Sequence, residues 1–173
     1  MFFELIGTLI AGAAAALIIW ALNRSLKGRL PGWLMPAGAG AAMLLATITS
    51  EYGWYERTRS AMPEGLEVAE AVKERAFYRP WTYLVPFVTR FVAVDMASMR
   101  QHPDQPGQRM VDLIFYGRWS RTAKVPVIFD CPGARRAEMA ADVAFATDGS
   151  VQNALWRDLR PDDPILQTAC EGG

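Results

Sequence analysis

The chain has 173 residues, which is enough for a helical anchor and one domain of ordinary size. Its 18 basic and 18 acidic side chains cancel, so the formal net charge is zero. Without a basic excess the chain lacks the electrostatic footprint of nucleic-acid binding, and we expect no nucleic-acid partner. The first third is mostly apolar, whereas the rest is dense in Arg, Asp and Pro. This division is typical of a membrane anchor joined to a water-exposed domain.

Two long runs without a charged residue, Leu5 to Leu22 and Leu30 to Ser50, lie in the first third of the chain. A helix rises about 1.5 Å per residue, so each run would be roughly 27–32 Å long, close to the ~30 Å of a bilayer's hydrocarbon core. The sequence therefore predicts a two-helix transmembrane hairpin over residues 1–56, with helices at about 3–23 and 31–54.

The charges around these runs predict an orientation. Arg24, Lys27 and Arg29 lie between the two runs, and positively charged loops stay in the cytoplasm. A cleaved signal peptide would need a basic start, but the segment from Met1 to Glu4 has an acid and no Lys or Arg. We therefore expect a multi-pass protein of the bacterial inner (plasma) membrane, in contact with lipid, with both termini in the periplasm.

Small residues recur four apart in both runs. Gly12 and Ala16 have this spacing in the first run, and Gly38 and Ala42 have it in the second. Such pairs let helix backbones approach closely. Two interpretations remain open: the two helices pack on each other, or one of these faces docks on a larger integral membrane protein.

A connector at residues 57–65 leads into a soluble, mainly β domain at residues 66–173. The segment 66–77 fits either a helix or a strand, because its acids precede its bases while its valines alternate. The overall expectation is a membrane-anchored α+β protein, in which a two-helix transmembrane hairpin is followed by a small mainly β extracytoplasmic domain.

An aromatic segment with two prolines follows, and it contains Arg79, Trp81, Tyr83 and Phe87. Trp, Tyr and Arg are the residues most often found at the centres of protein interfaces. These four are therefore candidate partner-binding residues, with Trp81 and Tyr83 facing the partner. The alternative is a core cluster in which Arg79 stacks on an aromatic ring.

The remaining pattern predicts mostly short strands and turns. We expect strands at 91–99, 110–119, 125–129, 143–145 and 151–159, a loop at 101–108, a helical segment at 134–141 and a turn at 147–150. The strands at 110–119 and 125–129 should pair as a hairpin. Asp162, Asp163 and Pro164 should cap a last helical turn that runs to Cys170.

Cys131 and Cys170 are the only cysteines, and both lie in the part predicted to be extracytoplasmic. An even pair in an oxidising compartment predicts a disulfide. A metal site is the competing interpretation, but it would need more soft or imidazole ligands, and the single histidine, His102, lies in a proline-bracketed segment far from both cysteines.

No catalytic motif accompanies His102 and Asp104, and we predict no catalytic, metal or cofactor residues. The expected function is that of a non-enzymatic accessory or assembly subunit of a larger bacterial inner-membrane complex. The alternative is a membrane-tethered periplasmic ligand-binding or sensor module, which would require a pocket. An enzyme such as a hydrolase that uses His102 is the least favoured possibility.

Overall fold

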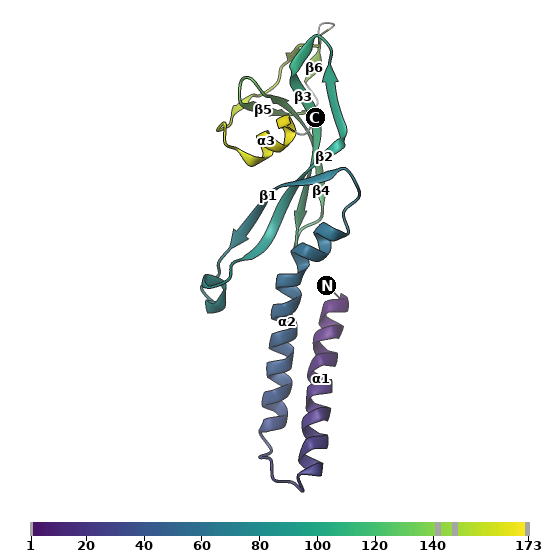
Figure 1. The fold of residues 1–173 in the computed structure, drawn as a ribbon, viewed down its shortest axis with the longest axis vertical. Coiled ribbons are helices and arrows are strands. Elements are labelled where there is room, and N and C mark those ends of the chain that lie inside the picture. The colour runs from purple at the N-terminus through teal and green to yellow at the C-terminus, as the bar shows by residue number, and fades with distance from the viewer. Residues whose placement is uncertain (1, 141–142, 147–148, 172–173) are drawn as a thin grey trace. The chain divides into compact units, whose positions relative to one another are not determined.

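The computed structural model describes residues 2–140, 143–146 and 149–171. It divides into two compact units, Met1–Arg57 and Thr58–Gly173. The elements, in chain order, are α1 (Phe2–Ser25), α2 (Leu34–Ser60), β1 (Leu66–Glu74), the 3-10 helix η1 (Pro80–Tyr83), β2 (Phe87–His102), β3 (Gln105–Gly117), β4 (Ala123–Asp130), β5 (Arg135–Glu138), β6 (Ala144–Phe145), β7 (Val151–Gln152), β8 (Arg157–Asp158) and α3 (Pro164–Glu171) (Figure 1).

The first unit is a pair of helices that approach closely at two glycines. A methyl group added at Gly12 would overlap the side chain of Met43, and one added at Gly38 would overlap Ile19. Both glycines of the predicted small-residue pairs therefore serve the packing of α1 on α2. The hydroxyl of Ser50 also donates a hydrogen bond of 2.7 Å to Oε1 of Glu4.

Only one helix in the described part of the chain, α1, is long and apolar enough to cross a membrane. A signal sequence near an N-terminus would have the same property. In α2 the segment from Leu34 to Ser50 is uncharged, but glycine, threonine, serine and Pro36 dilute its apolar content. The predicted transmembrane hairpin is thus not confirmed as a pair of spans. The helix α2 also continues to Ser60, so it includes the first residues of the connector that was predicted at 57–65.

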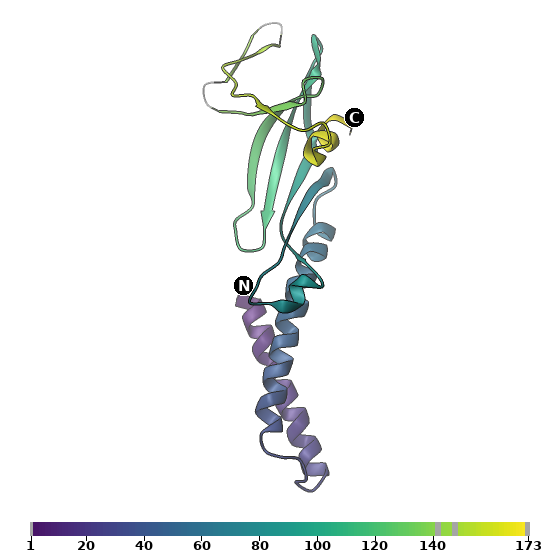
Figure 2. The same ribbon diagram turned by 90° about the vertical axis from the view of Figure 1, so that its left-hand side faces the viewer.

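The second unit is built on a curled antiparallel sheet of six strands in the order β1-β2-β3-β4-β5-β8, with β6 and β7 as a separate pair (Figures 1 and 2). The predicted 110–119 and 125–129 hairpin is present as β3 and β4, where Val111 pairs with Val127. The ambiguous segment 66–77 is a strand up to Glu74, because it pairs with β2 along most of its length.

Two sequence predictions in this unit are wrong. Residues 101–108 are not an open loop: β2 runs to His102, β3 begins at Gln105, and only a two-residue turn lies between them. His102 pairs with Gln105 across this turn. Residues 135–138 are a strand rather than part of a helix, since Arg135 pairs with Asp130 of β4; residue 141 lies outside the described residues. The predicted strand at 151–159 is present only as the short β7 and β8. Of the predicted turn at 147–150, residues 147–148 also lie outside the described part.

The core of this unit lies between the sheet and α3. Alternate residues of β2, β3 and β4 point to the face that α3 covers, as the period of two in a strand requires. The buried set consists of Val92, Val94, Val111, Leu113, Val127, Phe129, Ile165, Leu166 and Ala169. At about 1.5–3 kcal/mol for each large apolar side chain, this burial is the main stabilising term of the unit.

Candidate functional site

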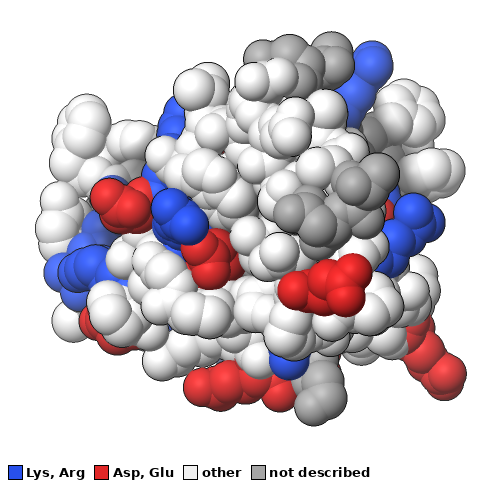
Figure 3. All heavy atoms as spheres, turned by 90° about the horizontal axis from the view of Figure 1, so that it is seen from above, with Lys and Arg blue, Asp and Glu red and all other residues white. Residues whose placement is uncertain are grey.

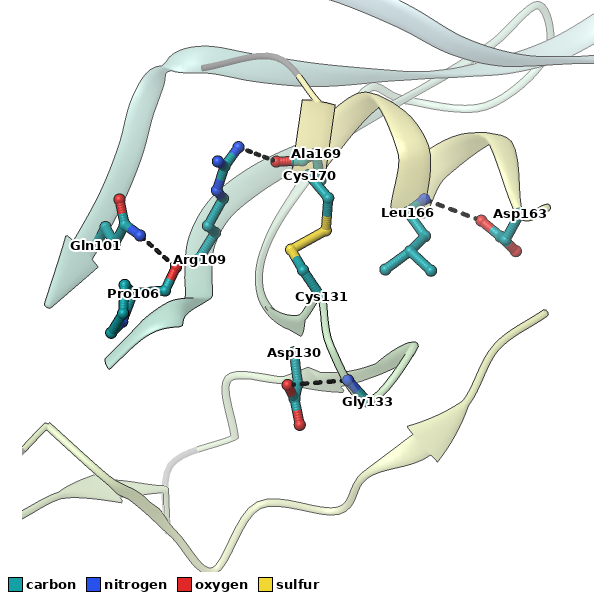
Figure 4. Close-up of a disulfide and its surroundings, with 10 residues drawn as sticks. All are labelled: Gln101, Pro106, Arg109, Asp130, Cys131, Gly133, Asp163, Leu166, Ala169 and Cys170. Atoms are coloured by element: carbon teal, nitrogen blue, oxygen red, sulfur yellow. Dashed lines mark hydrogen bonds between the residues drawn. A yellow bond between two sulfur atoms is a disulfide. The ribbon is translucent and has the colours of Figure 1, made fainter. Parts of the chain in front are cut away.

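A disulfide between Cys131 and Cys170 joins α3 to the end of β4, with the two Cα atoms 5.9 Å apart (Figure 4). The structure thus contains the predicted crosslink. It closes a sequence separation of 39 residues, which corresponds to roughly 3–4 kcal/mol in the chain-entropy model. The bond holds the helix that completes the core, so its role is structural.

Both ends of α3 are capped by groups drawn in Figure 4. Oδ1 of Asp163 accepts hydrogen bonds from the backbone amides of Ile165 at 3.0 Å and Leu166 at 3.1 Å, and Pro164 begins the helix. This is the cap that the sequence predicts. At the other end, Arg109 donates to the carbonyl oxygen of Ala169 at 3.2 Å, where a cation is favourable.

The four aromatic-segment residues named as partner-binding candidates do not share one environment. Phe87 is only 7% exposed and Trp81 is half-buried, whereas Tyr83 is exposed. The guanidinium of Arg79 lies 5.7 Å from the ring centre of Phe87. Phe87 is therefore buried beside a stacked arginine, which is the arrangement of the core alternative that the sequence left open. That Trp81 and Tyr83 face a partner stays a prediction.

The loop that carries this segment has a defined conformation. Thr82 is completely buried, and its hydroxyl oxygen accepts from the backbone amide of Ala76 at 3.0 Å. The same hydroxyl group lies 2.7 Å from the carbonyl oxygen of Arg79, to which it donates. One side chain thus ties the two ends of the turn together, and η1 begins with Pro80 at a position where proline is favoured.

A cavity of about 370 Å³ lies between the turn end of the β2–β3 hairpin and the β6–β7 pair. Its walls combine polar and apolar side chains. They are Arg100, Gln101, His102, Gln105, Gln108, Met110, Ile128, Phe145, Ala146, Gly149 and Val151. The buried Oε1 atom of Gln108 has no hydrogen-bond partner among the described residues. The cavity could therefore hold a small molecule with both an apolar and a polar part.

His102 lies at the edge of this cavity, packed against Gly149. The backbone of Gly149 has φ of 77°, and a methyl group added there would overlap the imidazole, so both conformation and space require glycine. Nδ1 of His102 accepts from the backbone amide of Asp104 at 3.3 Å. Oδ2 of Asp104 lies 3.8 Å from the same nitrogen, but the described residues that line the cavity include no serine, threonine, cysteine or carboxylate.

The described part of the chain contains no group of three or more His, Cys, Asp or Glu side chains placed to hold a metal ion. On the face shown in Figure 3, acidic and basic side chains are interspersed rather than gathered by sign. Neither observation identifies a cofactor or a polyanion site on these residues.

A charged cluster that the sequence did not suggest lies across three neighbouring strands. Nζ of Lys124 on β4 is 2.9 Å from Asp112 on β3 and 3.2 Å from Asp95 on β2. These hydrogen bonds, first to Asp112 and then to Asp95, raise the pKa of Lys124 above its usual 10.5. Only the register of the sheet places these residues side by side, so no local motif could have shown them.

Taken together, the chain is an α+β protein with a helix that could span a membrane and a curled antiparallel sheet to which a disulfide joins α3. No known family model, curated protein or solved structure matches it.

Proposed function

We propose that this chain is a non-enzymatic accessory or assembly subunit of a larger bacterial inner-membrane complex. In this proposal α1 and α2 both span the membrane, the turn between them is cytoplasmic, and both termini and the sheet domain are periplasmic. The disulfide supports the periplasmic placement, because such bonds persist in oxidising compartments.

The observation that carries the proposal is a second face of small residues on α2. Gly38 packs against α1, whereas Ala37, Gly40 and Ala41 are exposed. A methyl group added at Gly40 would have no atom within 4 Å. A helix that is only moderately apolar crosses a bilayer more favourably when other helices cover it, and small residues permit that approach. This second face gives α2 a surface for a helix of a partner.

The test compares two glycines of the helix pair. Gly40→Leu should leave α1 packed on α2 but block a partner helix, whereas Gly12→Leu should disturb the pair itself. After mild detergent extraction, wild type should migrate with a large complex on native electrophoresis, and Gly40→Leu should migrate as a smaller species. Wild type that migrates alone would contradict the proposal, as would Gly40→Leu that stays in the complex.

The proposed orientation has its own test. A reporter fused after Lys27 should behave as cytoplasmic, and alkaline phosphatase fused after Gly173 should be active. An inactive C-terminal phosphatase would contradict the periplasmic placement of the domain without bearing on whether α2 docks on a partner.

A membrane-tethered ligand-binding module is the second candidate, and the cavity beside His102 favours it. Arg100 offers positive charge, Oε1 of Gln108 offers an acceptor that has no partner among the described residues, and Met110 and Ile128 offer apolar wall. Native electrophoresis separates the candidates, because a ligand-binding module needs no stable complex. Retention of a small molecule by the purified chain, seen by mass spectrometry, would favour the second.

A further inference from the structure

The turn between β1 and β2 exposes an unusual number of large apolar side chains. We name residues 75–86 the apolar loop. Leu84 is 87% exposed and Phe77 is 84% exposed. The full exposed set in the apolar loop is Phe77, Tyr78, Tyr83, Leu84 and Val85. Protein surfaces in water routinely carry single apolar residues, but five large ones exposed in one loop indicate a binding surface.

We propose that the apolar loop inserts into the headgroup region of an anionic lipid bilayer. The proposal rests on the membrane anchoring by α1 put forward above, and it does not depend on a partner complex. It assigns the exposed part of the aromatic segment to lipid, while Thr82 and Phe87 remain the buried part that supports it.

The charges around the apolar loop fit an anionic surface. Arg75 begins the loop and Arg79 lies within it, and no acidic residue occurs between Glu74 and Asp95. Arginine next to exposed Phe, Tyr and Leu is the composition found where proteins lie in a bilayer interface, since cations contact the headgroups and apolar side chains reach the acyl boundary.

The conformation of the apolar loop is suited to this role. The hydroxyl of Thr82 closes the loop on Ala76 and Arg79, and the guanidinium of Arg79 lies 5.2 Å from the ring centre of Tyr78. A loop that is already ordered loses little conformational freedom on binding. Insertion would therefore bury Phe77 and Leu84 without first having to fold the segment.

Lipid fits this surface better than a protein does. Leucine and valine are under-represented among the residues that dominate protein interfaces, yet Leu84 and Val85 are prominent here. The chain also joins the apolar loop to a helix able to span a bilayer, and tethering raises the local concentration of the surface, so a modest affinity suffices.

The experiment uses the full chain reconstituted in vesicles of phosphatidylethanolamine and phosphatidylglycerol. Leu84→Cys and, as a matched control, Leu155→Cys are each labelled with a nitroxide, while the native disulfide stays closed. Leu155 is 83% exposed and lies between β7 and β8, far along the chain from the apolar loop. The measurement is collision of each label with oxygen, which is enriched in lipid, and with a polar nickel chelate.

We expect the oxygen-to-nickel ratio at residue 84 to be several-fold higher than at residue 155, and to fall when phosphatidylglycerol is omitted. Equal ratios in protein that floats with the vesicles would overturn the lipid assignment alone. Protein that fails to float would overturn both the anchoring and the lipid assignment. A label at residue 84 that is shielded from the nickel chelate in native membranes, but not in vesicles of pure lipid, would show that a protein covers the apolar loop. That result would also overturn the proposal.

Discussion

The helical unit and the sheet unit of this chain differ in how they bury their apolar residues. In α1 the only buried residue is Gly12, whereas β2, β3 and β4 bury an alternating row of valines, Leu113 and Phe129 beneath α3. The sheet unit thus carries its own core and crosslink. The helical unit leaves most of its apolar side chains uncovered in the chain alone.

The largest loss of stability is expected when the centre of the sheet core is removed. Phe129 is completely buried, so Phe129→Ala should leave a cavity and lower the free energy of unfolding of the sheet unit by about 3–5 kcal/mol. Thermal unfolding followed by near-ultraviolet circular dichroism measures this loss. Flotation with vesicles should be unchanged, and a variant that lost membrane association as well would show that the two units are not independent.

The crosslink is the next largest contribution. Cys170→Ser should lower the free energy of unfolding by about 2–4 kcal/mol and make the segment from Pro164 onward sensitive to protease, with flotation intact. Urea unfolding and limited proteolysis measure the two effects. Cys131→Ser is the matched control and should give the same loss, as should the double variant. Alkylation of both cysteines without reductant, in protein from its native membrane, would contradict the bridge.

A smaller effect is expected from the buried hydroxyl that closes the apolar loop. Thr82→Val keeps the shape of the side chain but leaves the amide of Ala76 without its acceptor, which should cost about 1–3 kcal/mol. Hydrogen exchange of residues 75–86 should accelerate more than that of β3. Uniform acceleration across the sheet would instead place Thr82 within the global core.

The smallest effect concerns Lys124, which is exposed, and it should appear only as a pH dependence. Its pKa is raised in the folded state by Asp112 and Asp95, so the stabilisation is complete below the unfolded value near 10.5 and is lost as pH rises through the higher folded value. Lys124→Gln should therefore be slightly less stable than wild type at neutral pH, and the two should converge in strong alkali. A stability difference between Lys124→Gln and wild type that stays the same at all pH values would contradict a stabilising role for this cluster.

Features with a local cause were predictable from the sequence. The Asp163 and Pro164 cap depends on neighbouring residues, and the structure has α3 beginning at Pro164. Apolar residues in β3 alternate over enough positions to indicate a strand, and β3 pairs with β4 as expected. The disulfide was predicted because both cysteines lie in the part expected to be extracytoplasmic. The structure joins them across a sequence separation of 39 residues.

The candidate sites were less predictable, because exposure depends on what packs nearby. Arg79, Trp81, Tyr83 and Phe87 look alike in sequence, yet Phe87 is buried while Tyr83 is exposed. The exposure of Phe77 and Leu84 is not predictable from their residue types, since apolar residues are normally assigned to the core. The cavity beside His102 combines residues from the β2–β3 hairpin, β4 and the β6–β7 pair, which no spacing along the chain connects.

By itself, the sequence determined the apolar first helix, the cap of α3 and the β3–β4 hairpin, because helix and turn signals act between residues only a few positions apart. Tertiary structure decided the strand at residues 66–74, which forms on β2, and the strand at 135–138, which forms on β4. Strand formation depends on a partner strand, and the hydrogen bonds and side-chain pairs that select it come from residues distant in sequence. For the same reason, only the register of the completed sheet brings Lys124, Asp112 and Asp95 together.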